Sequence, residues 1–168
     1  MYYLYKARAF ERQTDSDFGE LLVRRDRVRI NTHGIFALYL WIITMGNCSS
    51  YKVYLPSKDL CGGVKGPGEI VHESIVIHRC YKFPFLKGND IQIGPCKTNR
   101  EYRGRGIYPK VLQYIIDNEL GLGDCAYMII EENNVSSIRG VEKAGFRRVK
   151  RIDRNRILKR YTIINDSE

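Results

Sequence analysis

The sequence lacks the cysteine spacing that holds metal ions or cross-links small secreted domains. Five cysteines are present, at positions 48, 61, 80, 96 and 125, and no two of them form a Cys-x-x-Cys pair. An odd number without this spacing indicates neither a zinc site nor a disulfide framework. We therefore expect free thiols, no bound metal and a cytoplasmic protein, because disulfides are rare in reducing compartments.

Long apolar runs are missing as well. The run IFALYLWIITM covers only residues 35–45, whereas a helix that spans a membrane needs about 20 residues. We predict a buried helix segment here, or a buried strand, with the basic stretch RRDRVR at 24–29 as the solvated first half of the helix. Basic residues followed by apolar ones can also dock on a membrane surface, so peripheral membrane contact stays open. The first ten residues lack the basic and apolar regions of a signal peptide, and none is expected.

The composition is that of a basic globular domain. The chain has 168 residues, 43% of them hydrophobic, which suits one domain with a substantial core. Its formal net charge is +9, which favours an anionic ligand or partner, although basic residues also serve solubility alone. Nucleic acid, anionic lipid and phosphorylated small molecules are the candidate classes at this stage.

Local patterns predict a mixed sheet with helices packed on it. A helix is expected from Pro109 to Leu120, because apolar residues recur on one of its faces and Gly121 can end it. Asn134 is expected to cap a second, shorter helix that ends at Gly145. Strands are expected at 51–55, 69–78, 90–98 and 125–130, turns at 61–68 and 87–90, and a final hairpin of 146–152 and 156–164.

The segment REYRGRGIYPKVLQYIIDNEL, residues 100–120, carries the most specific chemistry. It joins a predicted strand to the amino terminus of a predicted helix, where unpaired N–H groups and a partial positive charge bind phosphate. Gly104 and Gly106 let the backbone come close to a ligand, and Arg103 and Arg105 add charge. The Walker pattern GxxxxGK[ST] is absent, and GxGxxG fails at Pro109. The segment therefore predicts a pyrophosphate-binding loop of another kind.

Residues 103–107 resemble the acetyl-CoA loop, Q/R-x-x-G-x-G/A, of the GNAT superfamily of N-acetyltransferases. A second segment, NNVSSIRGVEKAGFRRV at 133–149, is similar to the N-x-x-S-I-x-x-x-E-K-x-G-F pattern late in these proteins. The resemblance covers residues 90–150. It implies an α/β (α+β) GNAT fold with a mixed, mostly antiparallel sheet that splays between its fourth and fifth strands, and acetyl-CoA as the acetyl donor. The cofactor-binding residues it implies are Cys96, Thr98, Arg103, Gly104, Arg105, Gly106, Ile107, Tyr108, Asn134 and Ser137.

The same resemblance explains Gly94-Pro95, which interrupts a predicted strand. Proline cannot donate to a sheet ladder and belongs at an edge or a bulge, and the fourth strand of GNAT proteins bulges there. A simple strand end at Gly94 is the alternative. With the bulge, Cys96 and Thr98 would present backbone groups to the pantetheine arm, and an N–H there would polarise the thioester carbonyl.

Two positions depart from the family pattern. Tyr108 stands where the loop prefers glycine or alanine, so its ring must point away from the phosphates. Val141 stands where many members have a tyrosine that protonates the leaving thiolate. The general acid is therefore open between Tyr108, Tyr127, Cys96 and a thiolate that leaves unprotonated. As a nucleophile Cys96 has no Cys/His pattern to support it, and a packed thiol is expected.

Acetyl transfer also needs a group that removes a proton from the acceptor amine. Strand alternation in IVHESIVIH places Glu73 on a face with three apolar residues, where an unpaired carboxylate would be costly and its pKa raised. His72 would share the other face with Ser74 and His78, which can be wet. We therefore favour Glu73 over His72 as the base, with structural or surface roles as the alternative for each. Gln92, on the neighbouring strand, could hold a water instead.

The acceptor is expected to be a small-molecule amine. The segments YKFPFLKGNDIQIGPC and RGRGIYPKVL resemble a bacterial subgroup often found with surface-polysaccharide synthesis, which implies a nucleotide- or lipid-linked amino sugar. A protein or peptide N-acetyltransferase remains an alternative, as does a non-catalytic basic module that binds nucleic acid. No nucleic acid is expected, because the phosphate loop is intact and no aromatic-basic binding motif is present. The single domain 1–168 divides into an acceptor-side half (1–89), an acetyl-CoA-binding core (90–150) and a terminal strand (151–168).

Overall fold

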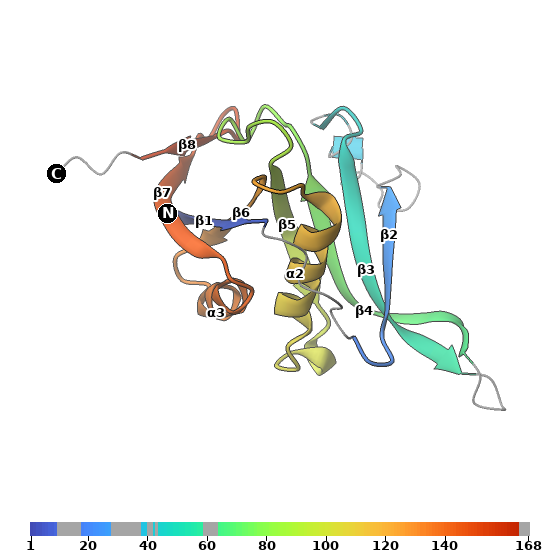
Figure 1. The fold of residues 1–168 in the computed structure, drawn as a ribbon. Coiled ribbons are helices and arrows are strands. Elements are labelled where there is room, and N and C mark those ends of the chain that lie inside the picture. Colours follow the sequence, from blue (N-terminus) through green and yellow to red (C-terminus); the bar gives the residue numbers. More distant parts are fainter. Residues whose placement is uncertain (10–17, 28–37, 40–41, 43, 59–63, 165–168) are drawn as a thin grey trace.

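The computed structural model describes residues 1–9, 18–27, 38–39, 42, 44–58 and 64–164, and its main element is an eight-stranded sheet (Figure 1). The strands are β1 Tyr2–Arg8, β2 Leu22–Arg27, β3 Cys48–Lys58, β4 Val64–Ile77, β5 Ile91–Thr98, β6 Cys125–Glu131, β7 Arg147–Arg154 and β8 Tyr161–Ile163. Their order across the sheet is β2-β3-β4-β5-β6-β1-β7-β8. Neighbouring strands are antiparallel, except for β5 and β6, which are parallel. The prediction of a mixed, mostly antiparallel α+β sheet is confirmed.

The first strand, β1, lies inside the sheet, and no strand had been predicted there. Its side chains alternate between the two faces of the sheet, as they do in any strand. Leu4 accordingly belongs to one buried cluster, whereas Tyr5 and Ala7 belong to the main core. β1 pairs with β6 on one side and with β7 on the other. Strand pairing therefore joins the start of the predicted acceptor-side half directly to strands that follow residue 124.

Two α-helices, α2 Ile107–Glu119 and α3 Val135–Lys143, pack on one face of the sheet (Figure 1). α2 begins two residues before the predicted Pro109, and its first residue, Ile107, is buried against the core. The buried face of α2 also contains Val111, Leu112, Ile115 and Ile116, as the apolar periodicity predicted. Asn134 caps α3, because its Oδ1 accepts a hydrogen bond of 3.2 Å from the N–H of Ser137. A short 3₁₀ helix, η1 Arg100–Tyr102, precedes the loop that leads into α2.

β5 and β6 part shortly after they begin. Only Ile91 and Gln92 of β5 pair with β6. On its other side β5 pairs with β4, and the register shifts at Gly94-Pro95, where β5 has one residue more than β4 between successive pairs. An extra residue of this kind is a β-bulge. The bulge and the splay that the resemblance implied are therefore both present.

Three local predictions were wrong. Residues 24–27 belong to β2 rather than to a helix, and residues 28–29 lie outside the described part of the chain. In the apolar run, 35–37, 40–41 and 43 also lie outside it, while Leu38, Tyr39 and Ile42 are helical but exposed rather than buried. The expected turn at 61–68 falls partly in 59–63, which is not described, and its remainder belongs to β4. Gly68 lets β4 approach β3 there, since a Cβ would lie 2.6 Å from the carbonyl oxygen of Leu55.

β7 and β8 form the predicted hairpin, but its second strand is shorter than the predicted 156–164, because residues 155–160 form the connection. The backbone N–H of Tyr161 donates to the carbonyl of Lys82, so the hairpin is tied to the loop that follows β4. None of the helices in the described part of the chain has the length and hydrophobicity needed to cross a membrane.

Candidate functional site

A cavity of about 610 Å³ opens where β5 leads into α2, between the first turn of α2 and one face of α3. We call it the loop cavity. Its lining residues are Cys96, Lys97, Thr98, Tyr102, Arg103, Gly104, Gly106, Ile107, Tyr108, Pro109, Asn134, Ser136, Ser137, Arg139, Gly140 and Lys143. A concave site of this size suits a small-molecule ligand.

The loop cavity gathers most of the predicted cofactor-binding residues. Nine of the ten line it, from the end of β5, the loop before α2 and the start of α3. Arg105 is the exception, because its guanidinium carbon lies 5.1 Å from the ring centre of Tyr102 and its side chain lines a separate cavity with Lys110. The binding role of all ten stays a prediction, and for Arg105 the geometry does not favour it.

The loop before α2 presents backbone rather than side chains. Gly104 and Gly106 have φ angles of +78° and +74°, and among the described residues no heavy atom lies within 4 Å of where their Cβ atoms would be. Gly106 is the N-cap of α2 and provides no side-chain cap. The first N–H groups of α2 therefore lack partners within the helix. Together with the helix dipole they favour an anion at this end of the cavity.

The charge of the loop cavity is one-sided. Four basic residues line it: Lys97, Arg103, Arg139 and Lys143. Of the described residues in its wall, none is aspartate or glutamate. Arg139 and Lys143 are four residues apart on α3 and therefore share a helix face, a pattern that the sequence analysis overlooked. The wall can hold several negative charges at once, as a polyphosphate ligand requires.

The inner wall of the cavity rests on a buried polar network centred on His72. Its Nδ1 lies 2.7 Å from Thr98 Oγ1 and its Nε2 lies 2.7 Å from Ser74 Oγ. Ser74 Oγ in turn donates to Cys96 Sγ at 3.2 Å. Burial lowers the pKa of His72 to about 4, so the ring is neutral near pH 7. The expectation that His72 sits on a wet face was wrong, because its side chain is fully buried.

Two of the three candidate general acids lie at this wall. Burial raises the pKa of the Cys96 thiol to about 11, so it is protonated near pH 7. Burial also raises the pKa of Tyr108, whose hydroxyl lies 3.3 Å from Ser137 Oγ. Tyr127 does not line the loop cavity, and its ring packs 5.3 Å from that of Phe85 in the cluster on the other side of the sheet.

Glu73 lies on the face of the sheet opposite the helices. Ser50 Oγ donates to its carboxylate at 3.0 Å, and Lys52 Nζ lies 3.7 Å away. The carboxylate is 28% exposed, so the premise of an unpaired carboxylate on a buried apolar face was wrong. In the sheet register Glu73 lies beside Lys97, a residue of the cavity wall. The structure therefore brings Glu73 next to the splayed part of β5, but from the other face.

Gln92 sits in the last pair that β5 makes with β6 before the two strands separate. It is 6% exposed, and its Nε2 donates to the carbonyl of Ile93 at 2.9 Å. Its Oε1 is buried and has no hydrogen-bond partner among the described residues. An orphaned buried acceptor is costly, so a ligand or water donor at the point of the splay would satisfy it. This agrees with the hypothesis that Gln92 holds a water.

The chain resembles known structures in fold. A candidate acetyltransferase of the GNAT family from Novosphingobium aromaticivorans DSM 12444 has a TM-score of 0.50 at 17% identity, over 89% of this chain and 61% of that one. A GNAT-family acetyltransferase from Colwellia psychrerythraea has a TM-score of 0.50 at 13% identity, over 88% of this chain and 52% of that one. The chain thus spans less than two thirds of the length of both. No protein-family model matches the sequence, and no curated protein does. The chain shares the fold of these two structures.

Proposed function

We propose that this chain transfers an acetyl group from acetyl-CoA to a primary amine by direct attack. The observation that carries the proposal is the loop cavity, in which a bare helix terminus, two open glycines and four basic residues meet at the splay of β5 and β6. Each of these features suits one part of the coenzyme, and the chain shares its fold with a candidate acetyltransferase of the GNAT family.

The residues of the wall fit the coenzyme part by part. The N–H groups at Gly104, Gly106 and the start of α2 would hold the pyrophosphate, because no side chain blocks close approach. Arg103, Arg139 and Lys143 would neutralise phosphate charge. From Cys96 to Thr98, β5 no longer pairs with β6, and its backbone groups on that side would bind the pantetheine arm along the splay. When bound there, acetyl-CoA supplies the acetyl group as an activated thioester.

Different groups around the splay carry out the two proton transfers, one from the acceptor amine and one to the departing thiolate. Glu73 accepts the proton of the acceptor amine, directly or through a water, since it is partly exposed and lies beside β5 on the face away from the helices. His72 positions the wall through Thr98 and Ser74, because both of its ring nitrogens are already engaged. Tyr108 is the acid that we favour for the departing thiolate, since its hydroxyl lies at the inner wall.

The acceptor that we propose is an amino sugar of a surface-polysaccharide precursor, carried on a nucleotide or lipid diphosphate and modified in the cytoplasm. The net charge of +9 and the sequence resemblance of the middle segments support it. A protein or peptide amine is the alternative acceptor. A non-catalytic basic module is the other alternative, and the open glycine loop argues against it, because such a loop would serve no purpose in a module that binds nucleic acid through basic side chains.

The test is to measure thermal unfolding of the full chain with CoA, with acetyl-CoA and with a mixed-sequence oligonucleotide. A ligand that binds only the folded state raises the midpoint, so we expect stabilisation by CoA and acetyl-CoA and none by the oligonucleotide. A panel of amines with acetyl-CoA, followed by detection of free thiol, then identifies the acceptor class. Stabilisation by the oligonucleotide alone would replace the enzyme by a nucleic-acid module.

A further inference from the structure

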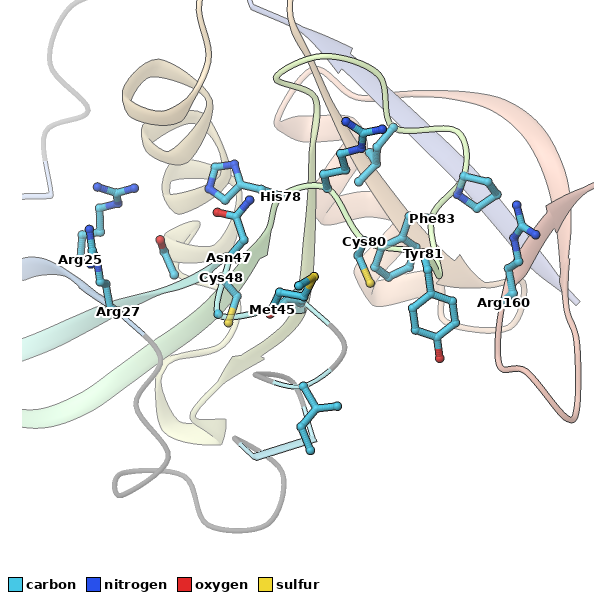
Figure 2. A pocket seen from close by; sticks show the side chains of 17 residues that line it. Arg25, Arg27, Met45, Asn47, Cys48, His78, Cys80, Tyr81, Phe83 and Arg160 are labelled. Atoms are coloured by element: carbon cyan, nitrogen blue, oxygen red, sulfur yellow. The ribbon is translucent and has the colours of Figure 1, made fainter.

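A second cavity, of about 1410 Å³, lies at the end of the sheet where β4 ends and β3 begins (Figure 2). We call it the arginine cavity. Because β4 and β5 are antiparallel, this is the opposite end of β5 from the loop cavity. Among the described residues, none lines both cavities. A ligand in the arginine cavity would therefore not compete for the coenzyme site.

The arginine cavity is basic, and among the described residues most of its positive charge has no carboxylate partner. Arg25, Arg27, Arg79 and Arg160 line it, while no aspartate or glutamate is found among its described lining residues. Arg25 is neutralised by Glu119, whose carboxylate oxygens lie 2.7 and 3.0 Å from its Nε and Nη2. Within the described part of the chain, no carboxylate lies within ion-pair distance of Arg27, Arg79 or Arg160.

The three arginines line the cavity from separate segments. Arg27 ends β2, Arg79 follows β4, and Arg160 precedes β8. Figure 2 shows Arg27 and Arg160 on opposite sides of the cavity, with Cys48 and Phe83 between them. Like charges brought to one concavity repel each other and concentrate anions there. Guanidinium groups bind carboxylate and phosphate in a bidentate manner. Phosphate carries more negative charge than a carboxylate, so it is the anion that several arginines favour.

Part of the remaining wall is apolar, and this part belongs to the face of the sheet that carries Glu73. Phe83 and Cys48 pack in one cluster with Ile75 and Ile77 of β4. Glu73 alternates in phase with these two isoleucines, on the face opposite the helices. A ligand in the arginine cavity therefore reaches the sheet from the face of the proposed base, as an acceptor must.

From this arrangement we infer that the arginine cavity binds the phosphate group of a phosphorylated small-molecule acceptor. The identification of the ligand as an acceptor rests on the proposed function, whereas the inference that the cavity binds an anion does not. A small molecule is favoured over nucleic acid or a membrane surface, because the arginines line a hollow with a partly apolar wall rather than forming a flat or linear basic patch. The ligand class is an amine that carries phosphate on a compact, partly apolar body such as a sugar.

The test uses the full chain saturated with CoA and measures the binding of glucosamine 6-phosphate, glucosamine and inorganic pyrophosphate by calorimetry at fixed ionic strength. We expect the two phosphate compounds to bind and glucosamine to bind at least tenfold more weakly. Arg79→Gln and Arg160→Gln should each weaken the phosphate compounds by about tenfold to a hundredfold, as the loss of a charge-assisted hydrogen bond does. Arg156→Gln is the matched control, since Arg156 is exposed in the same β7–β8 connection but does not line the cavity, and it should change nothing.

Four outcomes would overturn the inference. The first is the absence of binding for both phosphate compounds, and the second is equal weakening by Arg156→Gln, which would indicate a general charge effect. The third is displacement of CoA by the phosphate compounds, which would place them in the loop cavity. The fourth is tighter arginine-dependent binding of a mixed-sequence oligonucleotide or of vesicles with phosphatidylglycerol, which would replace the small molecule by a polymer or a membrane.

The same ligands and variants distinguish a failure of this inference from a failure of the proposed function. If phosphate compounds bind in an arginine-dependent way but no amine in the panel is acetylated, the anion site stands and the acetyl transfer falls. If neutral amines are acetylated with CoA bound, while Arg79→Gln and Arg160→Gln leave the KM of phosphorylated amines unchanged, the transferase stands and the phosphate site falls.

Discussion

The ring of Tyr108 at the start of α2 lies directly against Gly140 of α3. A Cβ on residue 140 would lie 2.5 Å from Cδ1 and 2.7 Å from Cε1 of that ring. The residues at the two positions therefore depend on each other. Tyr108 stands where the loop pattern prefers glycine or alanine, and its ring requires a glycine on the facing helix. The contact places the Tyr108 hydroxyl near Ser137 and 3.9 Å from Met128 Sδ on β6.

We predict that Gly140→Ala destabilises the protein by about 1–3 kcal/mol, because the new methyl group collides with the ring and overpacks the helix contact. Tyr108→Ala removes the collision, so the double variant should be less destabilised than the sum of the single variants. Urea unfolding of the four proteins gives the coupling. Additive losses would mean that the ring and Gly140 do not touch in solution.

The coenzyme loop is tested with Gly106→Val, which should abolish measurable CoA binding because the side chain fills the space needed by the pyrophosphate. Gly123→Val is the matched control, since Gly123 also has a positive φ, +92°, with nothing described within 4 Å of its Cβ position, but lies outside the cavity. Arg103→Ala should weaken CoA less, since the backbone donors remain. Normal CoA affinity in a folded Gly106→Val protein contradicts the proposed site.

The role of Glu73 is tested with Glu73→Gln, which keeps the shape of the side chain and removes the base. We expect the rate of acetyl transfer to fall by about a hundredfold or more, and the acidic limb of the pH–rate profile to vanish, with CoA affinity unchanged. Glu131→Gln, on an exposed position at the end of β6, is the control. A near-normal rate with the acidic limb intact would exclude Glu73, and His72→Ala is then the variant to measure.

His72 makes the folding stability depend on pH. The unfolded histidine binds a proton below a pH of about 6.5, whereas burial lowers the pKa of the folded His72 to about 4. Stability rises with pH wherever the unfolded state binds more protons, so the contribution of His72 is present above about pH 6.5 and is lost as the pH falls toward 4. The loss is about 3 kcal/mol for one such group.

The measurement is the free energy of unfolding in urea between pH 4 and pH 7 for the native chain and for His72→Gln. Carboxylates titrate in both proteins, so only the difference between the two curves reports on His72. We expect the curve of the variant to be flatter between about pH 4 and 6.5. Parallel curves would show that His72 is protonated alike in the folded and unfolded states.

Acetyl transfer should be independent of metal ions. In the described part of the chain, no group of three or more His, Cys, Asp or Glu side chains is placed to hold a metal. We expect the rate to be unchanged after treatment with EDTA and gel filtration. A loss of rate that zinc or magnesium restores would contradict this prediction.

The local features were predictable because neighbouring residues decide them. The helix that begins near Pro109 follows from apolar periodicity, and the Asn134 cap follows from the side-chain oxygen that a helix start needs. Gly104 and Gly106 were identified because only glycine adopts their positive φ without strain. These signals lie within windows of at most about 11–18 neighbouring residues, so a single sequence contains them.

The apolar and basic segments near the start of the chain were misread for the opposite reason. Residues 24–27 look like a solvated helix but form β2, because β3 supplies the pairing partners from about 25 residues away. The sequence around β1 does not indicate where this strand lies in the sheet, because its place between β6 and β7 depends on pairing with residues more than a hundred positions distant. Long-range pairing of this kind leaves little local trace.

The sequence by itself thus determined the two glycines of the loop before α2, the helices α2 and α3, and the fold class. Only the tertiary structure decided which face His72 and Glu73 occupy, that Lys97, Arg139 and Lys143 join the loop cavity, and that three arginines from separate segments line another cavity. Alternation along β4 separates the two faces, but it does not state which one the helices cover. That choice is made by packing, because the face with the larger matching apolar surface is the one that α2 and α3 bury.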